Sequence, residues 1–388
     1  MVNWMTIEDI SSNVFAGGTP NTKHDEYYDG DIPWIRSGEI DFNVITSAER
    51  NITTAGYKNS SAKMIRRGSV VMAMTGATVA KTAVVEIETS ANQSVCAIET
   101  DETKAYYKYV YYCLANDYLK IKSSAQGALT SLNLAMIKQI EIPIPDLKEQ
   151  HRIVEILDTF TASINNIKQQ LSDRRRQFVQ YSDYLLGLEE KEGVELKMLE
   201  QIVSKKCPLS YGIVQPGDDI KNGVPVVRPV DFADKIYIKR DGLKKTLKTI
   251  SDSYKRTILN GDEILFCVRG TTGTMGLATE ELKGSNVTRG IVPISFDNEV
   301  TKKFVFYQLG GYRLQKAIEE KTNGTALRQI NVKDLRQLSL YMPSIQEQSR
   351  IVTILDTFTE GIENVEEQLK RRQQQYEYYR AKLISLLK

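Results

Sequence analysis

The sequence predicts an α+β protein in which two similar modules, each dominated by β-sheet, alternate with two long helices. The segment EQHRIVEILDTF at residues 149–160 returns as EQSRIVTILDTF at residues 347–358, with ten of twelve positions identical. Each copy opens a long stretch in which apolar residues recur at alternating steps of four and three. A repeat separated by about half the chain indicates duplication of a whole module with its helix rather than a short-period solenoid.

The composition is that of an ordinary globular protein, and 388 residues suffice for two or more domains with their own cores. No run of about eighteen apolar residues is present, so we expect no transmembrane span and no membrane partner. The start, MVNWMTIEDI, lacks the basic and apolar regions of a secretory signal. Four cysteines without a C-x-x-C pair predict reduced, partly buried thiols in a cytoplasmic protein; they are Cys96, Cys113, Cys207 and Cys267.

Charge is distributed unevenly between the two modules. Residues 1–145 carry 13 Lys and Arg against 16 Asp and Glu, whereas residues 191–343 carry 25 against 18. The basic second module suits a polyanionic partner, and the acidic first module gives no such indication.

Several catalytic classes lack their residues in this chain. The only histidines are His24 and His151, too few for a His-rich metal site or a convincing Ser-His triad. There is no G-x-x-x-x-G-K-[ST] phosphate loop and no G-x-G-x-x-G after a strand. There is also no aromatic-flanked Pro-Pro pair of the kind with which amino-methyltransferases hold a flipped base. We therefore expect a non-catalytic chain without a metal site.

The repeat divides the chain into four segments: a module at 1–145, a helix at 146–190, a module at 191–343 and a helix at 344–388. Each helix begins with a capping residue three positions before a glutamate, Asp146 before Glu149 and Ser344 before Glu347. This spacing predicts a capping box, in which both side chains satisfy free amide N–H groups.

The apolar positions of the two helices match over about five heptads, the pattern of a left-handed coiled coil. The alternative is two separate amphipathic helices, each lying on its own module. Arg174 and Arg372 interrupt the series at equivalent places, either to select a register or as packed stems with solvated heads. The matched positions are Ile153, Leu157, Phe160, Ile164, Ile167, Leu171, Phe178, Tyr181, Leu185 and Leu188 against Ile351, Leu355, Phe358, Ile362, Val365, Leu369, Tyr376, Tyr379, Leu383 and Leu386.

The modules align with each other more loosely, over three pairs of segments. A strand-like run followed by an arginine and a turn occurs at 30–40 and 222–232, and a β-rich run entering a Gly/Thr loop occurs at 67–85 and 260–278. A small-residue loop before a short helix occurs at 123–133 and 321–331. These pairs predict a twisted sheet with an exposed loop in each module.

The polar residues of these segments are the candidate nucleic-acid contacts, because hydroxyls, glycine-freed amides and cations suit phosphate oxygens and base edges. The Gly/Thr loops could equally serve only as tight turns, the arginines as structural ion pairs and the small-residue loops as solvated surface. The candidates are Arg36, Thr75, Thr78, Lys81, Gln93, Lys122 and Gln126 in the first module, and Arg228, Arg269, Thr271, Thr272, Thr274, Arg289, Lys321, Asn323, Thr325 and Arg328 in the second.

The whole arrangement resembles the specificity (S) subunit of type I restriction–modification systems. The resemblance rests on the doubled P-x-x-x-EQ-x-RIV-x-IL-D motif, the long heptad helices behind it, and the arginine and Gly/Thr-loop motifs in each module. It implies two pseudo-symmetric α+β target recognition domains, separated by a long antiparallel two-helix coiled coil that acts as a spacer. Each domain would read one half of a bipartite site in double-stranded DNA.

The resemblance also implies the partners. Two methyltransferase (M) subunits would dock on the helices, and restriction (R) subunits would join them. S-adenosylmethionine, ATP and Mg would be bound by those partners, and this chain would bind no cofactor. Two other readings compete: a self-contained nuclease or methyltransferase, and a coiled-coil protein-interaction scaffold without DNA specificity.

Overall fold

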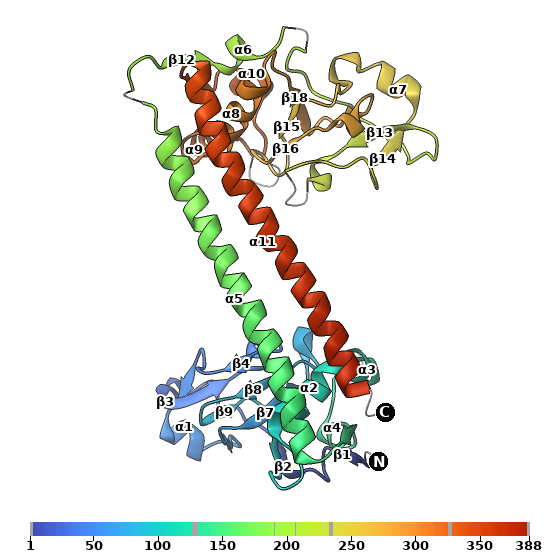
Figure 1. Cartoon of the computed structure of the whole chain (residues 1–388). Helices are drawn as coiled ribbons and strands as arrows, with labels where there is room; N and C mark the ends of the chain where they lie inside the picture. Colours follow the sequence, from blue (N-terminus) through green and yellow to red (C-terminus); the bar gives the residue numbers. More distant parts are fainter. Residues whose placement is uncertain are drawn as a thin grey trace. The chain divides into compact units, whose positions relative to one another are not determined.

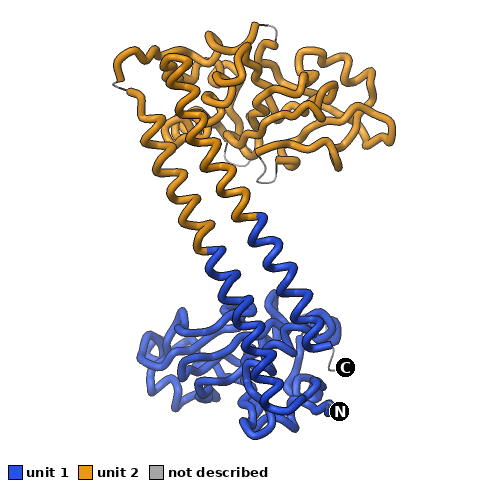
Figure 2. The backbone as a smooth tube through the Cα atoms, viewed as in Figure 1, with its two compact units in different colours: residues 1–168, 367–388 blue, residues 169–366 orange. Residues whose placement is uncertain are grey.

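Two compact units make up the protein in its computed structural model, which describes residues 3–125, 131–189, 191–205, 207–232, 236–324 and 328–385. The first unit comprises residues 1–168 and 367–388, and the second comprises residues 169–366 (Figure 2). Each unit therefore contains one module, the start of one long helix and the end of the other. The α+β character predicted for both modules is confirmed.

The first unit is built on three sheets (Figure 1). The two-stranded sheet pairs β1 (Asn3–Thr6) with β11 (Glu141–Ile144). The five-stranded sheet, in the order β2-β10-β7-β8-β4, comprises β2 (Ser11–Ala16), β4 (Val44–Ile45), β7 (Ser69–Ala73), β8 (Thr82–Val85) and β10 (Val95–Thr100). The four-stranded sheet, in the order β5-β3-β9-β6, comprises β3 (Tyr28–Ile35), β5 (Asn51–Ile52), β6 (Met64–Ile65) and β9 (Thr89–Ala91). The helices are α1 (Thr54–Lys58), α2 (Tyr107–Asn116), α3 (Tyr118–Ser124), α4 (Leu134–Lys138) and α5 (Leu147–Leu186), which continues into the second unit.

The second unit repeats this plan with shorter sheets. Its two-stranded sheet pairs β12 (Glu195–Met198) with β19 (Ser339–Met342). One three-stranded sheet has the order β14-β13-β17, with β13 (Val224–Val227), β14 (Lys244–Thr246) and β17 (Asn286–Val287), and the other the order β16-β15-β18, with β15 (Ile264–Cys267), β16 (Met275–Leu277) and β18 (Ile291–Ile294). The helices are α6 (Leu199–Ile202), α7 (Lys248–Asp252), α8 (Glu299–Gly310), α9 (Tyr312–Glu320), α10 (Val332–Arg336) and α11 (Ile345–Ser385), which continues into the first unit.

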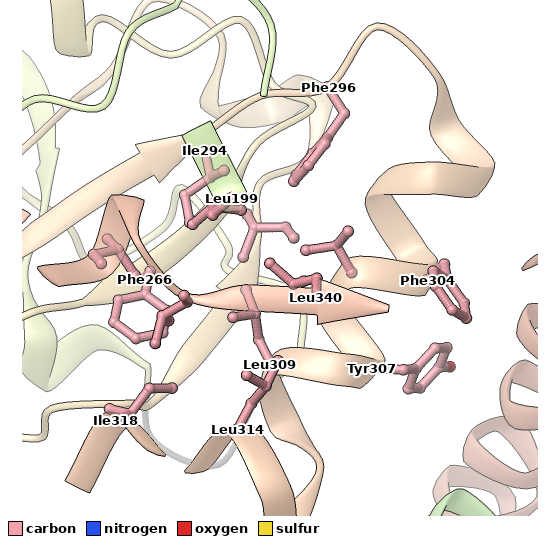
Figure 3. Close-up of a cluster of buried hydrophobic side chains, with 14 of the residues drawn as sticks. Leu199, Phe266, Ile294, Phe296, Phe304, Tyr307, Leu309, Leu314, Ile318 and Leu340 are labelled. Carbon is pink, nitrogen blue, oxygen red and sulfur yellow. The ribbon is translucent and has the colours of Figure 1, made fainter. Parts of the chain in front are cut away.

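The central strand of each module is buried on both faces. In β15, Ile264 and Phe266 join one apolar cluster and Leu265 and Cys267 join another, as the alternation of side chains along a strand requires. Strand β7 divides its residues in the same way between two clusters of the first unit. Figure 3 shows the cluster that Phe266 joins, where strand side chains meet those of α8. Burial on both faces explains why these strands have almost uninterrupted apolar sequences.

The repeated motif at the helix starts joins each helix to its module. Gln150 is fully buried, where it accepts from the Tyr106 backbone N–H at 2.8 Å and donates to the Pro145 carbonyl at 2.9 Å. Gln348 likewise donates to the Pro343 carbonyl at 2.9 Å. The glutamine is repeated because it satisfies buried backbone groups where the chain enters the helix.

Only half of the predicted capping box forms at each helix start. Asp146 accepts from the backbone N–H of Glu149 at 2.9 Å, as predicted. The Glu149 carboxylate, however, accepts from Nε and Nη2 of Arg152 at 2.7 and 2.6 Å, and this pairing lowers the pKa of Glu149. Among the described residues, Glu347 forms the same pair with Arg350. The arginine one turn further along the helix therefore competes successfully for the glutamate.

The first apolar positions of each helix belong to the core of a module. The heptad pattern predicted instead that these residues would pack only against the other helix. Ile153 and Leu157 are fully buried in the main cluster of the first unit, together with Ile384 from the end of α11. Ile351 and Leu355 occupy the equivalent cluster of the second unit. The alternative of helices lying on their own modules is therefore correct for these first turns.

The helices also contact each other within each unit. In the first unit, Phe160 stacks on Tyr379 with ring centroids 5.4 Å apart, and the Arg372 guanidinium lies 5.5 Å from the Phe160 ring centroid. In the second unit, Tyr181 lies 5.1 Å from Phe358. The early part of one helix thus meets the late part of the other, so the two run antiparallel inside each unit. Arg174 is exposed and Arg372 half-buried.

A second polar junction, which we call the Lys-Tyr-Asp junction, fastens each helix to its module. In the first unit, Asp158 on α5 accepts from Lys108 Nζ at 2.9 Å and from the Tyr112 hydroxyl at 2.6 Å. In the second unit, Asp356 on α11 accepts in the same way from Lys303 and Tyr307, each at 2.6 Å. The hydrogen bond to Asp356 raises the pKa of Lys303 against the opposing effect of burial. Burial, and then the same carboxylate, raises the pKa of Tyr307.

Replacing Asp356 by asparagine is expected to destabilise the second unit by about 1.5–3 kcal/mol, the usual value of hydrogen bonds to a charged group. Asparagine preserves the shape but leaves the half-buried Lys303 ammonium without its counter-charge. Urea denaturation followed by circular dichroism measures the loss. Asp173→Asn is the control, because this half-exposed carboxylate on α5 lies outside the junction and accepts from exposed neighbours such as Gln169; it should cost less than about 0.5 kcal/mol. An equal decrease in the free energy of unfolding in both variants would show that the junction stabilises the protein no more than an exposed carboxylate does.

Candidate nucleic-acid interface

Parallel strand pairing brings two of the predicted segments of the first module together. Strand β3 pairs in parallel with β9, so their carboxyl ends lie side by side. The pairing continues beyond the strands, because the backbone N–H of Asn92 donates to the Ile35 carbonyl at 3.0 Å. Arg36 and Gln93 are the next residues of the two segments.

The Gly/Thr loop of the first module lies at the same edge. The backbone N–H of Met74 donates to the Ser94 carbonyl at 2.8 Å, and the Thr78 hydroxyl donates to the Ser37 carbonyl at 2.8 Å. Gly76 has φ +79°, a backbone conformation that favours glycine, and a side chain added there would meet open space. The small-residue loop joins as well, since Leu132 N–H donates to the Met74 carbonyl at 2.8 Å.

The second module forms an equivalent edge with the same hydrogen bonds. Strand β13 pairs in parallel with β17, and Thr288 N–H donates to the Val227 carbonyl at 3.0 Å. Val268 N–H donates to the Gly290 carbonyl at 2.8 Å, and Ile330 N–H donates to the Val268 carbonyl at 3.0 Å. We call these surfaces the first edge, of residues 36–39, 75–78, 92–94 and 131–132, and the second edge, of residues 228–231, 269–274, 288–290 and 328–330.

The matched arginines at the strand ends are both held by carboxylates. The Arg228 guanidinium donates to the two carboxylate oxygens of Asp231 at 3.2 and 2.8 Å, and this interaction raises the pKa of Arg228. Arg36 donates to Glu49, and its backbone N–H donates to Glu39 at 2.8 Å. The structural ion pair considered as the alternative for these arginines is therefore present. The turn that follows each strand is closed by Glu39 or Asp231, whose carboxylate accepts from the backbone N–H of the arginine.

The two edges differ in charge. On the second edge, Arg289 is exposed and Arg269 half-buried, and neither forms an ion pair with a carboxylate in the part of the chain that the structure describes. The position matching Arg289 on the first edge is Gln93, which accepts a hydrogen bond from Thr19. Beside the first edge, Lys81 pairs with Asp41 at 2.6 Å. The second edge is therefore the more cationic surface.

Four other candidates of the second module lie in or beside its edge. Thr271 and Thr274 are exposed ends of a turn closed by a 3.1 Å backbone bond, and the Thr272 hydroxyl donates to the Arg328 carbonyl at 3.0 Å. The Arg328 guanidinium pairs with Glu319 at 3.0 Å.

The remaining candidates are less closely connected. The Asn323 backbone pairs with Gln329, and Lys321 is exposed at the end of α9. Thr75 is half-buried at the start of its turn. The Lys122 ammonium lies 5.4 Å from the Tyr118 ring centroid and donates to the Tyr118 hydroxyl, and among the described residues it does not contact the first edge. Gln126 and Thr325 lie outside the described residues.

Sequence reasoning missed the Lys-Tyr-Asp junction, although a signal was present. Lys108 and Tyr112 stand four residues apart, as do Lys303 and Tyr307, and each pair precedes its helix motif by a similar distance. A spacing of four places both side chains on one helical face. The sequence prediction identified Arg228 but not its carboxylate partner, Asp231.

The described residues contain no group of three or more His, Cys, Asp or Glu able to hold a metal ion. The four cysteines are free and buried, and burial raises the pKa of the Cys96 thiol to about 12. Such a thiol stays protonated at neutral pH and is a poor nucleophile. None of the helices in the described ranges has the length and apolar character needed to cross a membrane.

Comparison with known proteins gives consistent results. Residues 1–174 and 189–372 each match the type I restriction modification DNA specificity domain. The EcoBI specificity subunit of Escherichia coli is 27% identical over 306 residues, which cover 72% of this chain and 64% of that subunit. The EcoR124I/EcoR124II specificity subunit of the same species is 28% identical over 204 residues, half of each chain. The MjaIX specificity subunit of Methanocaldococcus jannaschii is 24% identical over 398 residues, with 94% and 88% coverage.

This chain thus spans between half and two thirds of the two Escherichia coli relatives. Among solved structures, a chain from a study of complex assembly in a type I R-M system matches with a TM-score of 0.63 and 17% identity, covering 99% of this chain and 97% of that one. The S subunit from M. genitalium matches with a TM-score of 0.59 and 15% identity, covering 99% and 96%. At these identities the likeness shows the fold.

Proposed function

The chain belongs to the type I restriction modification DNA specificity domain family, and from that premise we propose that it is the sequence-specific DNA-binding subunit of a type I restriction–modification complex. Each module would be a target recognition domain that reads one half of a bipartite site. The observation that carries this proposal is the convergence of the same polar segments on one edge of each unit.

We further propose the division of labour along the chain. Residues 1–145 and 191–343 would read DNA, and the helices at 146–190 and 344–388 would fix the spacer between half-sites and dock two methyltransferase subunits. The nearly equal lengths of α5 and α11, 40 and 41 residues, suit such a role. The chain itself would be non-catalytic and cytoplasmic. S-adenosylmethionine, ATP and Mg would be used by the methyltransferase and restriction subunits.

The direct test is methylation mapping in a host with and without this chain, with its methyltransferase subunit present in both. We expect methylated adenines at a bipartite site only when the chain is present. Binding of the reconstituted complex to a duplex carrying that site should exceed binding to a scrambled duplex by at least about a thousandfold. A methylation pattern that does not depend on the chain would overturn the proposal.

Deleting one heptad from each helix, residues 165–171 together with 363–369, is expected to shorten the preferred spacer while both half-sites stay unchanged. Seven residues correspond to about 10 Å of helix, or about three base pairs. The same methylation mapping measures the spacer. Deleting 165–171 alone is the control, and it should lower activity because the two helices lose their common register. Altered half-sites with an unchanged spacer would show that the helices do not set the distance.

A further inference from the structure

The turn that follows each matched arginine has a different middle residue at the two edges. In the first unit it is a 3₁₀ turn of Ser37–Glu39, and in the second a 3₁₀ turn of Pro229–Asp231. The middle residue is Gly38 in the first turn and Val230 in the second. Because both turns begin at the carboxyl end of the strand that positions the edge, these two residues occupy equivalent places.

Among the apolar side chains of residues 229–232, Val230 is the one that is not packed. Phe232 is 2% exposed in the core of the second module. Pro229 lies so close to Gly290 that a Cβ on that glycine would approach the proline ring to 2.8 Å. Val230, between them, is 72% exposed.

The turn holds Val230 in a fixed place. The backbone N–H of Asp231 donates to the Arg228 carbonyl at 2.9 Å, and the Asp231 carboxylate accepts from the Arg228 backbone at 2.8 Å as well as from its guanidinium. Valine is also stiff at χ1, because both of its methyl groups branch from Cβ. The side chain is therefore both rigid and exposed. A rigid side chain loses little conformational entropy when it binds, which favours its use as a recognition contact.

The surroundings are cationic, since Arg269 and Arg289 lie in neighbouring segments of the same edge. The side chain of valine has no donor or acceptor, so it cannot hydrogen-bond to phosphate oxygens or to polar base edges. In the major groove the one apolar group is the C5 methyl of thymine, and aliphatic side chains contact it. Gly38 has no side chain and therefore offers no such contact on the first edge. The space that a Cβ would occupy there is open, with no heavy atom within 4 Å.

We propose that Val230 is a specificity-determining residue that contacts the methyl group of a thymine in the half-site read by the second module. This inference rests on the proposed function and adds to it the identity of one base contact. The two modules would then differ at this position, since the first edge presents only backbone there.

The test uses the complex of this chain with its methyltransferase subunits and a duplex carrying the mapped site. Each thymine of the second half-site is replaced in turn by deoxyuridine, which lacks only the methyl group. For the unaltered chain, one such replacement should weaken binding about threefold to fourfold, the value of one buried methyl group. For Val230→Gly, deoxyuridine and thymine at that position should bind equally.

Two further variants provide the controls. Val230→Thr keeps the shape with one methyl group exchanged for a hydroxyl, and it should retain part of the thymine preference. Gly38→Val changes the equivalent turn of the first edge and should leave the response of the second half-site unchanged. Three results would overturn the inference. The loss of affinity could be the same for deoxyuridine at every thymine, or the loss at the one position could persist in Val230→Gly. The second half-site could also prove to contain no thymine. Absence of any specific binding by the unaltered complex would instead contradict the proposed function.

Discussion

Replacing Leu355 by alanine is expected to destabilise the second unit by about 2–5 kcal/mol, the usual cost of truncating a fully buried leucine. Leu355 is 0% exposed in the cluster where α11 meets the module. Its counterpart Leu157 is equally buried in the first unit, so Leu157→Ala is expected to have the same effect there. Each loss should stay largely confined to one unit, because the two clusters share no residue.

The positions of the tryptophans allow the two units to be followed separately. The chain has two tryptophans, Trp4 and Trp34, and both belong to the first unit. In urea denaturation, Leu157→Ala should lower the midpoint of the fluorescence transition. Leu355→Ala should leave that midpoint unchanged and lower the transition seen by circular dichroism alone. If Leu355→Ala shifted the fluorescence midpoint as strongly as Leu157→Ala, the two units would unfold as a single cooperative block.

If the second edge faces DNA as proposed, replacing Arg289 by alanine should weaken binding of the assembled complex to its target by about 1–3 kcal/mol, or about 5- to 150-fold. Arg289 is exposed and forms no ion pair with any described carboxylate, so its full charge is available to DNA. The slope of the logarithm of affinity against the logarithm of salt concentration should fall by about one, as for the loss of a single phosphate contact. Titration of a labelled duplex at several salt concentrations gives both quantities.

Gln93 provides the matched control, because it occupies the equivalent place on the first edge without a charge. Gln93→Ala should leave the salt dependence unchanged, and Gln93→Arg should increase it by about one. Lys197→Ala removes one positive charge from β12, outside both edges, and should have little effect. An unchanged affinity and salt dependence in Arg289→Ala would mean that the second edge does not face the DNA.

The parts of the fold that were predicted correctly are those governed by local sequence. Two long helices, two α+β modules and the exposed Gly/Thr loops all follow from periodicity and turn residues. What the apolar residues contact could not be predicted in the same way. Ile153 and Leu157 fit a heptad pattern, but periodicity identifies an apolar face without specifying whether a helix or a module covers it.

The candidate site shows the same limit. The matched segments could be found by comparing the modules, yet their convergence depends on parallel pairing of β3 with β9 and of β13 with β17. Such pairing joins strands far apart in the chain, and no short-range pattern specifies it. The carboxylate partners of Arg36 and Arg228 lie within reach in sequence, but the competition between an ion pair and a nucleic-acid contact is settled only in three dimensions.

The division of the chain into units has a consequence for synthesis on the ribosome. The second unit is continuous in sequence, from 169 to 366, and can complete its core as soon as those residues have emerged. The first unit is translated earlier, but its core includes Ile384, with Tyr376 and Leu383 packed against it. The module made first is therefore finished last, and until then the apolar surface that receives Ile384 stays uncovered. A nascent chain stalled before residue 376 would therefore carry a complete core in the second unit and an incomplete core in the first.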